Sequence, residues 1–305
     1  MKDIIGHEKI QDFFAKVIDN SGLSHAYLFV GLEMLGKKTV AENIATKLLE
    51  VENLQTCPDF TSVDQLFDEK TGKTKKNITV AQIRDLKEFL SRSSYSGGYK
   101  VAIINGAEKM NSEASNALLK TLEEPSAKTI LFLITTDESK LPETIQSRCQ
   151  MIYFRPVEKD LIEKYLKNLD KENFEEMTRF SLGLPGKVIN WLDDSEQYEL
   201  YRQEIIRFDS LFDKSFHEKI KTVEDLFGDK TDHIAARKKL MDVLQIWEIL
   251  VRDSFLKDKS IHKIKTSLDG ALANNLYNSI YEAKKMLLQN IHPKLLVENI
   301  LLQIP

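Results

Sequence analysis

The sequence predicts an α/β domain built on a parallel sheet, followed by two α-helical parts. In residues 1–155, short runs of β-branched and aromatic residues alternate with amphipathic helical runs, a pattern typical of a parallel sheet. Beyond Pro156 no convincing strand recurs, and apolar residues follow helical spacing. We therefore expect residues 1–155 to form the α/β core, 156–196 a small helical part and 197–305 a larger helical bundle.

Five segments of the first part have the composition of buried strands. They are Tyr27–Val30, Phe60–Val63, Val101–Ile104, Ile130–Ile134 and Met151–Phe154. Between the third and the fourth, a helix is predicted over about residues 111–124, with Asn111 or Ser112 as its N-cap. Helical spacing puts four of its apolar residues on one face, which we expect to lie in the core: Ala114, Ala117, Leu118 and Leu122.

Composition limits the class of protein. With 305 residues, 42% of them apolar, the chain can bury more than one core. No apolar run reaches the length of a membrane span and the first residues lack a secretory layout, so we expect a cytoplasmic protein outside the membrane. A net charge of -4 gives no overall attraction for nucleic acid, so DNA contact would need a local patch.

A candidate phosphate loop follows the first predicted strand. The pattern G-x-x-x-x-G-K occurs at Gly31, Gly36 and Lys37, between a strand and a helix, where backbone N–H groups can surround a phosphate. The next residue should be Ser or Thr to hold Mg²⁺, but it is Lys38, and Thr39 comes one place late. The loop is therefore degenerate. Such a loop has either lost productive ATP binding or still binds some nucleotide. The alternative is an ordinary strand-to-helix turn that binds nothing.

The acidic pair of a phosphoryl-transfer site is also missing. Such a site needs carboxylates at the end of a neighbouring strand, to organise Mg²⁺ and to polarise water. The strand Val101–Ile104 leads instead into Asn105 and Gly106. Glu108 comes two to three residues late and is expected to face solvent, with a role as substitute base as the alternative. We expect hydrolysis by this chain to be absent or very slow.

Several segments together carry a resemblance to a known family. The most specific are "NALLKTLEEP" at residues 116–125 and "SRC" at 147–149, and "IIGHEKI", "SLGLPGK" and "NIHPKLLVENILLQI" extend the likeness over nearly the whole chain. The chain resembles the delta prime family of bacterial DNA polymerase III clamp loader subunits, kin of gamma/tau within the AAA+ superfamily. The resemblance implies a RecA-like AAA+ core, an α-helical lid and an α-helical collar through which five subunits form a ring.

The resemblance also assigns roles to single residues. Arg148 matches the family's arginine finger, which acts in trans on ATP bound by a neighbouring subunit, and Ser147 and Cys149 would hold the turn that aims it. Thr136 falls where the family keeps its first polar sensor, and Lys187 where active relatives place the arginine of the second sensor. The alternative for Arg148 is a surface arginine that bonds a helix end or pairs with a carboxylate. The alternative for Thr136 is an ordinary strand-end hydroxyl.

Partners and cofactors follow from the same resemblance. It implies a non-hydrolysing subunit of the DNA polymerase III holoenzyme, in the bacterial cytoplasm, that contacts gamma/tau and delta subunits, the sliding clamp and primed DNA within the ring. No cofactor is required, although ATP or ADP could bind without hydrolysis. Zinc is not expected, because Cys57 alone remains where many relatives carry four cysteines. The alternatives are an active gamma-like ATPase, a helicase-loader-type AAA+ protein, or a DNA-binding module that acts without a ring, which the net charge disfavours.

Overall fold

The computed structural model describes residues 4–20, 22–68, 73–74, 77–126, 128–169, 173–227, 233–255, 270–289 and 291–305. The chain forms two compact units, Met1–Val188 and Ile189–Pro305, and each is described by itself. The first unit holds the α/β core and most of the predicted lid. The division into parts at residues 155 and 196 stays a prediction.

The core of the first unit is a five-stranded parallel sheet with the order β2-β5-β6-β1-β7. Its strands are β1 (Ala26–Val30), β2 (Phe60–Val63), β5 (Lys100–Asn105), β6 (Thr129–Thr135) and β7 (Gln150–Tyr153). All five predicted strands are confirmed, and each bound lies within one residue of the prediction. The central strands β1 and β6 are buried along their whole length, as expected for a sheet covered on both faces.

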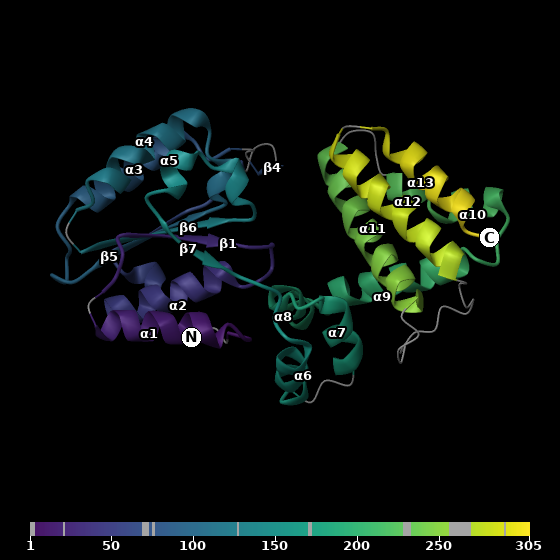
Figure 1. The fold of residues 1–305 in the computed structure, drawn as a ribbon, viewed down its shortest axis with the longest axis horizontal. Helices are drawn as coiled ribbons and strands as arrows, with labels where there is room; N and C mark the ends of the chain where they lie inside the picture. The colour runs from purple at the N-terminus through teal and green to yellow at the C-terminus, as the bar shows by residue number, and fades with distance from the viewer. Residues whose placement is uncertain are drawn as a thin grey trace. The chain divides into compact units, whose positions relative to one another are not determined.

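Helices cover both faces of this sheet (Figure 1). α1 (Glu8–Asp19) and α2 (Lys37–Leu49) lie on one face, and α3 (Val80–Ser91), α4 (Ser112–Glu123) and α5 (Glu143–Gln146) lie on the other. Because successive strand residues point to opposite faces, Tyr27 joins Phe14 and Phe132 on the α1/α2 side, whereas Leu28 packs with Leu118 on the α4 side. The aromatic rings of the first group are 4.8–6.0 Å apart.

The predicted helix over residues 111–124 is confirmed as α4. Asn111 is the N-cap, since its side chain accepts a hydrogen bond from the backbone N–H of Ala114 at 2.8 Å. Ala114, Leu118 and Leu122 are buried in the core, and Ala117 packs against it. Polar capping at one end and one apolar face therefore account for this helix.

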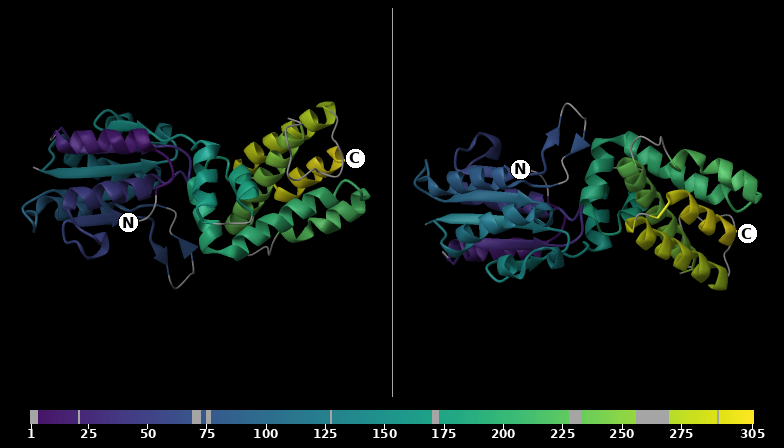
Figure 2. Two further views of the ribbon diagram at one scale, coloured as in Figure 1. Left: turned by 90° about the horizontal axis from the view of Figure 1, so that it is seen from below. Right: turned by 90° about the horizontal axis from the view of Figure 1, so that it is seen from above.

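The remaining elements of the first unit connect or flank the sheet. A short antiparallel hairpin, β3 (Phe67–Asp68) and β4 (Lys73–Thr74), projects from the core (Figure 2). One-turn helices are η1 (Leu54–Thr56), η2 (Ala107–Lys109) and η3 (Glu138–Lys140). α6 (Lys159–Lys167), α7 (Phe174–Ser181) and the start of α8 (Pro185–Asp193) follow β7 in the same unit.

The second unit is helical throughout its described residues. Beyond the end of α8 it contains α9 (Ser195–Ser210), α10 (Phe216–Thr222), η4 (Glu224–Phe227), α11 (His233–Phe255), α12 (Gly270–Leu288) and α13 (Pro293–Gln303). Trp247 is fully buried and stacks at a tilt on Phe208, and its indole N–H donates to Glu204 at 2.9 Å. Among the described helices of both units, none has the length and apolar character of a membrane-crossing segment.

Candidate functional site

The predicted phosphate loop joins β1 to α2 at the carboxyl-terminal edge of the sheet. Gly36 ends the loop as the N-cap of α2 with φ +82°, a conformation that side chains other than hydrogen disfavour. The buried Lys37 ammonium folds back and donates to the carbonyl oxygens of Gly31 at 2.5 Å and Leu32 at 2.6 Å. The loop is thus bonded to the first residue of the helix that follows it.

Burial lowers the pKa of Lys37 to about 8, although the carboxylates of Glu108 and Glu33 act in the opposite direction. Only 6% of the residue is exposed, so water contributes little to the stabilisation of its charge. Both of its hydrogen-bond acceptors are neutral carbonyl oxygens. A phosphate in the pocket would therefore stabilise the charged form of this lysine.

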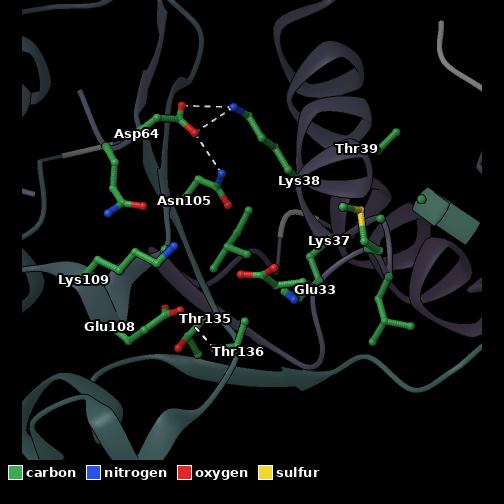
Figure 3. Close-up of a pocket in the computed structure, with 17 residues that line it drawn as sticks. Glu33, Lys37, Lys38, Thr39, Asp64, Asn105, Glu108, Lys109, Thr135 and Thr136 are labelled. Carbon is green, nitrogen blue, oxygen red and sulfur yellow. Dashed lines mark hydrogen bonds and ion pairs between the residues drawn. The ribbon is translucent and has the colours of Figure 1, made fainter. Parts of the chain in front are cut away.

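Lys38 does not point away from the site, but binds a carboxylate that sequence analysis missed (Figure 3). Its Nζ lies 3.0 Å from both oxygens of Asp64, the residue that follows β2, and the Asn105 side-chain amide donates to the same carboxylate at 2.8 Å. Burial alone would raise the pKa of Asp64, but the hydrogen bonds from Asn105 and Lys38 and the lysine charge outweigh it and lower that pKa. Asp64 is therefore ionised at neutral pH and joins α2 to β5.

Glu108 also lies in the pocket, so the expectation that it points to solvent is wrong. Gly106, with φ +78°, starts the one-turn helix η2, and this turn brings the Glu108 side chain back over the end of the sheet. The hydroxyl of Thr136 donates to Glu108 Oε1 at 3.0 Å, and Glu108 Oε2 is buried. Figure 3 shows this carboxylate on the side of the pocket opposite Asp64.

These groups surround a cavity of about 470 Å³. It is lined by residues 33–39 of the loop and α2, residues 64 and 65 after β2, residues 105, 106, 108 and 109 after β5, residues 134–136 at the end of β6, and Gly186. The backbone N–H of Gly186 donates to the carbonyl of Met34 at 2.8 Å, which bonds the start of α8 to the loop. Five of the predicted residues line the cavity: Gly36, Lys37, Lys38, Thr39 and Thr136. Lys187 follows Gly186, which lines the cavity, but is not itself among the lining residues.

Arg148 lies at the end of α5, and its neighbours come from elements other than those that line the cavity. Its guanidinium donates to the carbonyl of Thr144 at 2.8 Å and to Glu123 of α4 at 2.8 Å. A longer contact of 3.3 Å reaches the Ser147 hydroxyl. In the chain by itself, Arg148 makes the two contacts that the alternative reading predicts, a helix end and a carboxylate.

Ser147 and Cys149 flank this arginine in different surroundings. The Ser147 hydroxyl donates to the Thr144 carbonyl at 3.3 Å and is exposed. Cys149 packs against the core beneath α4 and α5, and burial raises the pKa of its thiol to about 12. The thiol is therefore protonated and apolar in character, and its role in holding the turn stays a prediction.

The profile of a family described as "DNA polymerase III, delta subunit" matches residues 6–158, about half of the chain, from the segment before α1 to the end of the core. The chain belongs to this family. The match includes the loop, the strand ends that form the pocket, and Arg148.

Curated relatives carry related names. The chain is 40% identical over 137 residues to the DNA polymerase III subunit delta' of Pseudomonas aeruginosa, covering 41% of this chain and 42% of that protein. It is 26% identical to subunit delta' of Bacillus subtilis, covering 94% of this chain and 92% of that protein. It is 30% identical to subunit tau of Escherichia coli over 56% of this chain, and spans only 28% of that protein.

A solved structure supports the fold. A DNA polymerase III gamma subunit-related protein of Thermotoga maritima matches with a TM-score of 0.52 and 20% identity, over 95% of this chain and 97% of that one. At this identity the likeness establishes the fold alone. Together with the five-stranded parallel sheet, it confirms the predicted α/β core with helical regions after it.

Two features of the candidate site in this delta subunit family member were missed from the sequence. Asp64 could have been found, because it directly follows a predicted strand, at the edge of the sheet where the phosphate loop lies. The pairing of Glu123 with Arg148 could not, since 25 residues separate them and both lie at helix ends. The ion pair joins the "NALLKTLEEP" segment, which contains Glu123, to the "SRC" segment, which contains Arg148.

Proposed function

We propose that this chain is a non-hydrolysing, delta prime-type subunit of a DNA polymerase III clamp loader, and that it supplies Arg148 in trans to ATP held by a gamma or tau subunit. The observation that carries the proposal is that Arg148 and the chain's own phosphate pocket lie on different elements of the first unit. The guanidinium lies with Glu123 and Thr144, whereas the chain's own pocket is lined by other elements. An arginine so placed can serve a neighbour's phosphates better than those in its own loop.

The chain's own pocket supports the absence of hydrolysis. Phosphoryl transfer needs a carboxylate at the end of a second strand of the sheet and a hydroxyl after the loop lysine, both to hold Mg²⁺. Asn105 and Lys38 occupy these positions, and both bind Asp64. Both side chains direct N–H donors at Asp64, and neither offers an oxygen ligand in this arrangement, so we infer that the chain needs no cofactor of its own.

Arg148 is able to leave its present contacts when a neighbour approaches. Its ion pair with Glu123 involves side chains that are 35% and 51% exposed, and such pairs contribute about 0–1 kcal/mol. A triphosphate offers a stronger, charge-assisted acceptor that the planar guanidinium can bind with two donors. In the GTPases where the effect is known, an arginine finger accelerates transfer by about 10³ to 10⁵.

The partners of the proposed subunit follow from the family. Relatives named delta', tau and gamma/tau belong to DNA polymerase III, which supports assembly of this chain with gamma/tau and delta subunits in the bacterial cytoplasm. We infer that the assembled ring acts on the sliding clamp and primed DNA. The net charge of -4 favours DNA contact through the ring over binding by the free chain.

One observation favours a second candidate, a slow ATPase of the gamma type. Glu108 lies inside the pocket, bonded to Thr136 and close enough to raise the pKa of Lys37 by its charge. A carboxylate in that place could orient a water molecule. The other strand-end carboxylate of the pocket, Asp64, is bound by Lys38 and Asn105 and is not open to a metal, which is why we place this candidate below the first.

Turnover of ATP by the purified chain, with Mg²⁺ and primed DNA, separates the two. The first candidate predicts the background rate, unchanged by Glu108→Gln. The second predicts turnover well above background that Glu108→Gln abolishes, and that result would overturn the proposal. Glu113→Gln, a charge removal in the first turn of α4, is the matched control.

A further inference from the structure

The phosphate loop raises a question about the metal that its fold family uses. In P-loop NTPases, Mg²⁺ is held by the Ser or Thr after the loop lysine and by an aspartate at the end of a neighbouring strand. The residues at those positions here are Lys38 and Asn105, and both point to one carboxylate, Asp64 (Figure 3). Their bonds decide whether a divalent ion fits.

The residues present do not fit Mg²⁺. The ion requires oxygen ligands in a near-octahedral arrangement, and it keeps several waters. At this place Lys38 Nζ lies 3.0 Å from each oxygen of Asp64, and Asn105 directs its NH₂ group, not its oxygen, at the same carboxylate. The Ser62 hydroxyl donates to Asp64 as well, at 3.0 Å. A divalent ion on Asp64 would face an ammonium and two further donors.

We infer that the Lys38 ammonium takes the place of the divalent metal in this pocket, and that the pocket binds a polyphosphate through Lys37 and Lys38 without a metal ion. Asp64 and Asn105 are positioning residues in this arrangement, because they hold the ammonium at the end of the sheet. The inference goes beyond the proposed function and does not depend on Arg148.

Three features support an anion as the ligand. Two lysine side chains at successive positions, both at the start of α2, line the same cavity of about 470 Å³, and a helix start favours an anion. Lys37 is 6% exposed and bonds only to neutral carbonyl oxygens, so its charge lacks a direct anionic partner. Lys109 lines the same cavity. A polyphosphate would complete the hydrogen bonds of Lys37 and compete with Asp64 for Lys38.

The direct test is calorimetric titration of the full chain with pyrophosphate and with ADP, each in EDTA and in excess Mg²⁺. The inference predicts binding in EDTA, with an affinity that Mg²⁺ leaves equal or lowers because the ion neutralises the ligand. Binding that appears only with Mg²⁺ would overturn it. The absence of binding in both buffers at millimolar ligand would also overturn the inference.

Two substitutions of opposite effect sharpen the test. Lys38→Thr restores the hydroxyl of hydrolysing loops and should weaken binding in EDTA by about tenfold or more, since a charge-assisted hydrogen bond is lost. Asp64→Asn removes the competing carboxylate and should strengthen binding in EDTA. Lys47→Thr, the same change at an exposed site on α2, should leave the affinity unchanged. If either pocket variant has the affinity of the unaltered chain, the inference fails.

These outcomes are separable from folding and from the proposed function. The thermal midpoint of each variant, followed by circular dichroism, identifies a chain that no longer folds. Should Lys38→Thr unfold, Asp64→Asn alone still decides the direction of the effect. A polyphosphate site that fails this test leaves the in trans role of Arg148 intact, because that role is measured on a neighbour's ATP.

Discussion

The Arg148 guanidinium lies 2.8 Å from the Glu123 carboxylate, and this contact joins the end of α5 to the end of α4. The two residues belong to the two sequence segments that are most specific for the family. A second donor of Arg148 holds the Thr144 carbonyl. The proposed finger is therefore kept in place by its own unit before any neighbour arrives, through contacts that solvent partly reaches.

Removal of this ion pair should cost little stability. We expect Glu123→Gln to lower the free energy of unfolding by less than about 1 kcal/mol, because the pair is partly exposed and screened. Urea unfolding in low and high salt provides the measurement. A loss of about 3 kcal/mol or more, typical of broken buried pairs, would mean that the pair is structural and that Arg148 is not free to move.

The cap of α4 should matter more than that surface pair. We expect Asn111→Ala to lower the free energy of unfolding by about 1 kcal/mol, because the Ala114 N–H loses its acceptor. Ser112→Ala, one residue into the helix, should change it by less than about 0.5 kcal/mol. Equal effects of the two changes in urea unfolding would contradict the assignment of Asn111 as the cap.

Cys149 should be chemically inert in the folded chain. Burial raises the pKa of its thiol to about 12 from an ordinary value of 9.0, so the thiolate fraction at pH 8 falls by about a thousandfold. Mass spectrometry after brief treatment with iodoacetamide should find Cys149 unmodified in the native chain and modified in urea. Rapid native modification would show that the turn beside Arg148 is held loosely.

The second unit should lose stability as the pH rises through the range 4.5 to 6. Burial raises the pKa of Glu204 to about 6 from 4.5, against the nearby Arg207 charge and the hydrogen bond from Trp247. The folded state binds the proton more tightly than the unfolded state, so stability is fully present below pH 4.5 and falls by about 2 kcal/mol above pH 6.

Urea unfolding at pH 4.5 and pH 7, followed by Trp fluorescence, measures this dependence. Glu204→Gln keeps an acceptor for the Trp247 N–H and removes the titration, so the difference between the two pH values should shrink by that amount. Glu199→Gln, an exposed carboxylate on the same helix, is the control. An unchanged pH dependence in Glu204→Gln would contradict the raised pKa.

Much of the fold could be predicted because its signals are local. Runs such as Ile130–Ile134 are apolar over the length of a strand, and Asn111 caps a helix whose apolar face is regular. The residues of the phosphate loop were found in the same way, by short spacing between a strand and a helix. Local pattern was sufficient wherever one element or one turn contained the whole feature.

The charge pairs of the site could not be predicted, because they join residues from different elements. The sequence pattern identifies Lys38 as a missing metal ligand, but its bond to Asp64 crosses 26 positions. The bond from Asn105 to Asp64 depends on the pairing of β2 with β5. The expectation that Glu108 faces solvent is wrong because spacing alone does not reveal that η2 turns back over the sheet. Arg148 and its partner likewise meet only in the folded unit.

The central claim is that Arg148 acts on the ATP of a neighbouring subunit. The measurement that tests it most directly is the ATP turnover of gamma or tau in the reconstituted clamp loader, with the unaltered chain and with Arg148→Ala, Arg148→Lys and Arg155→Ala. We predict that the first two variants assemble but lose the stimulation that this chain provides, because lysine lacks the bidentate fork, and that Arg155→Ala keeps it. Full stimulation by an assembled Arg148→Ala complex would contradict the account.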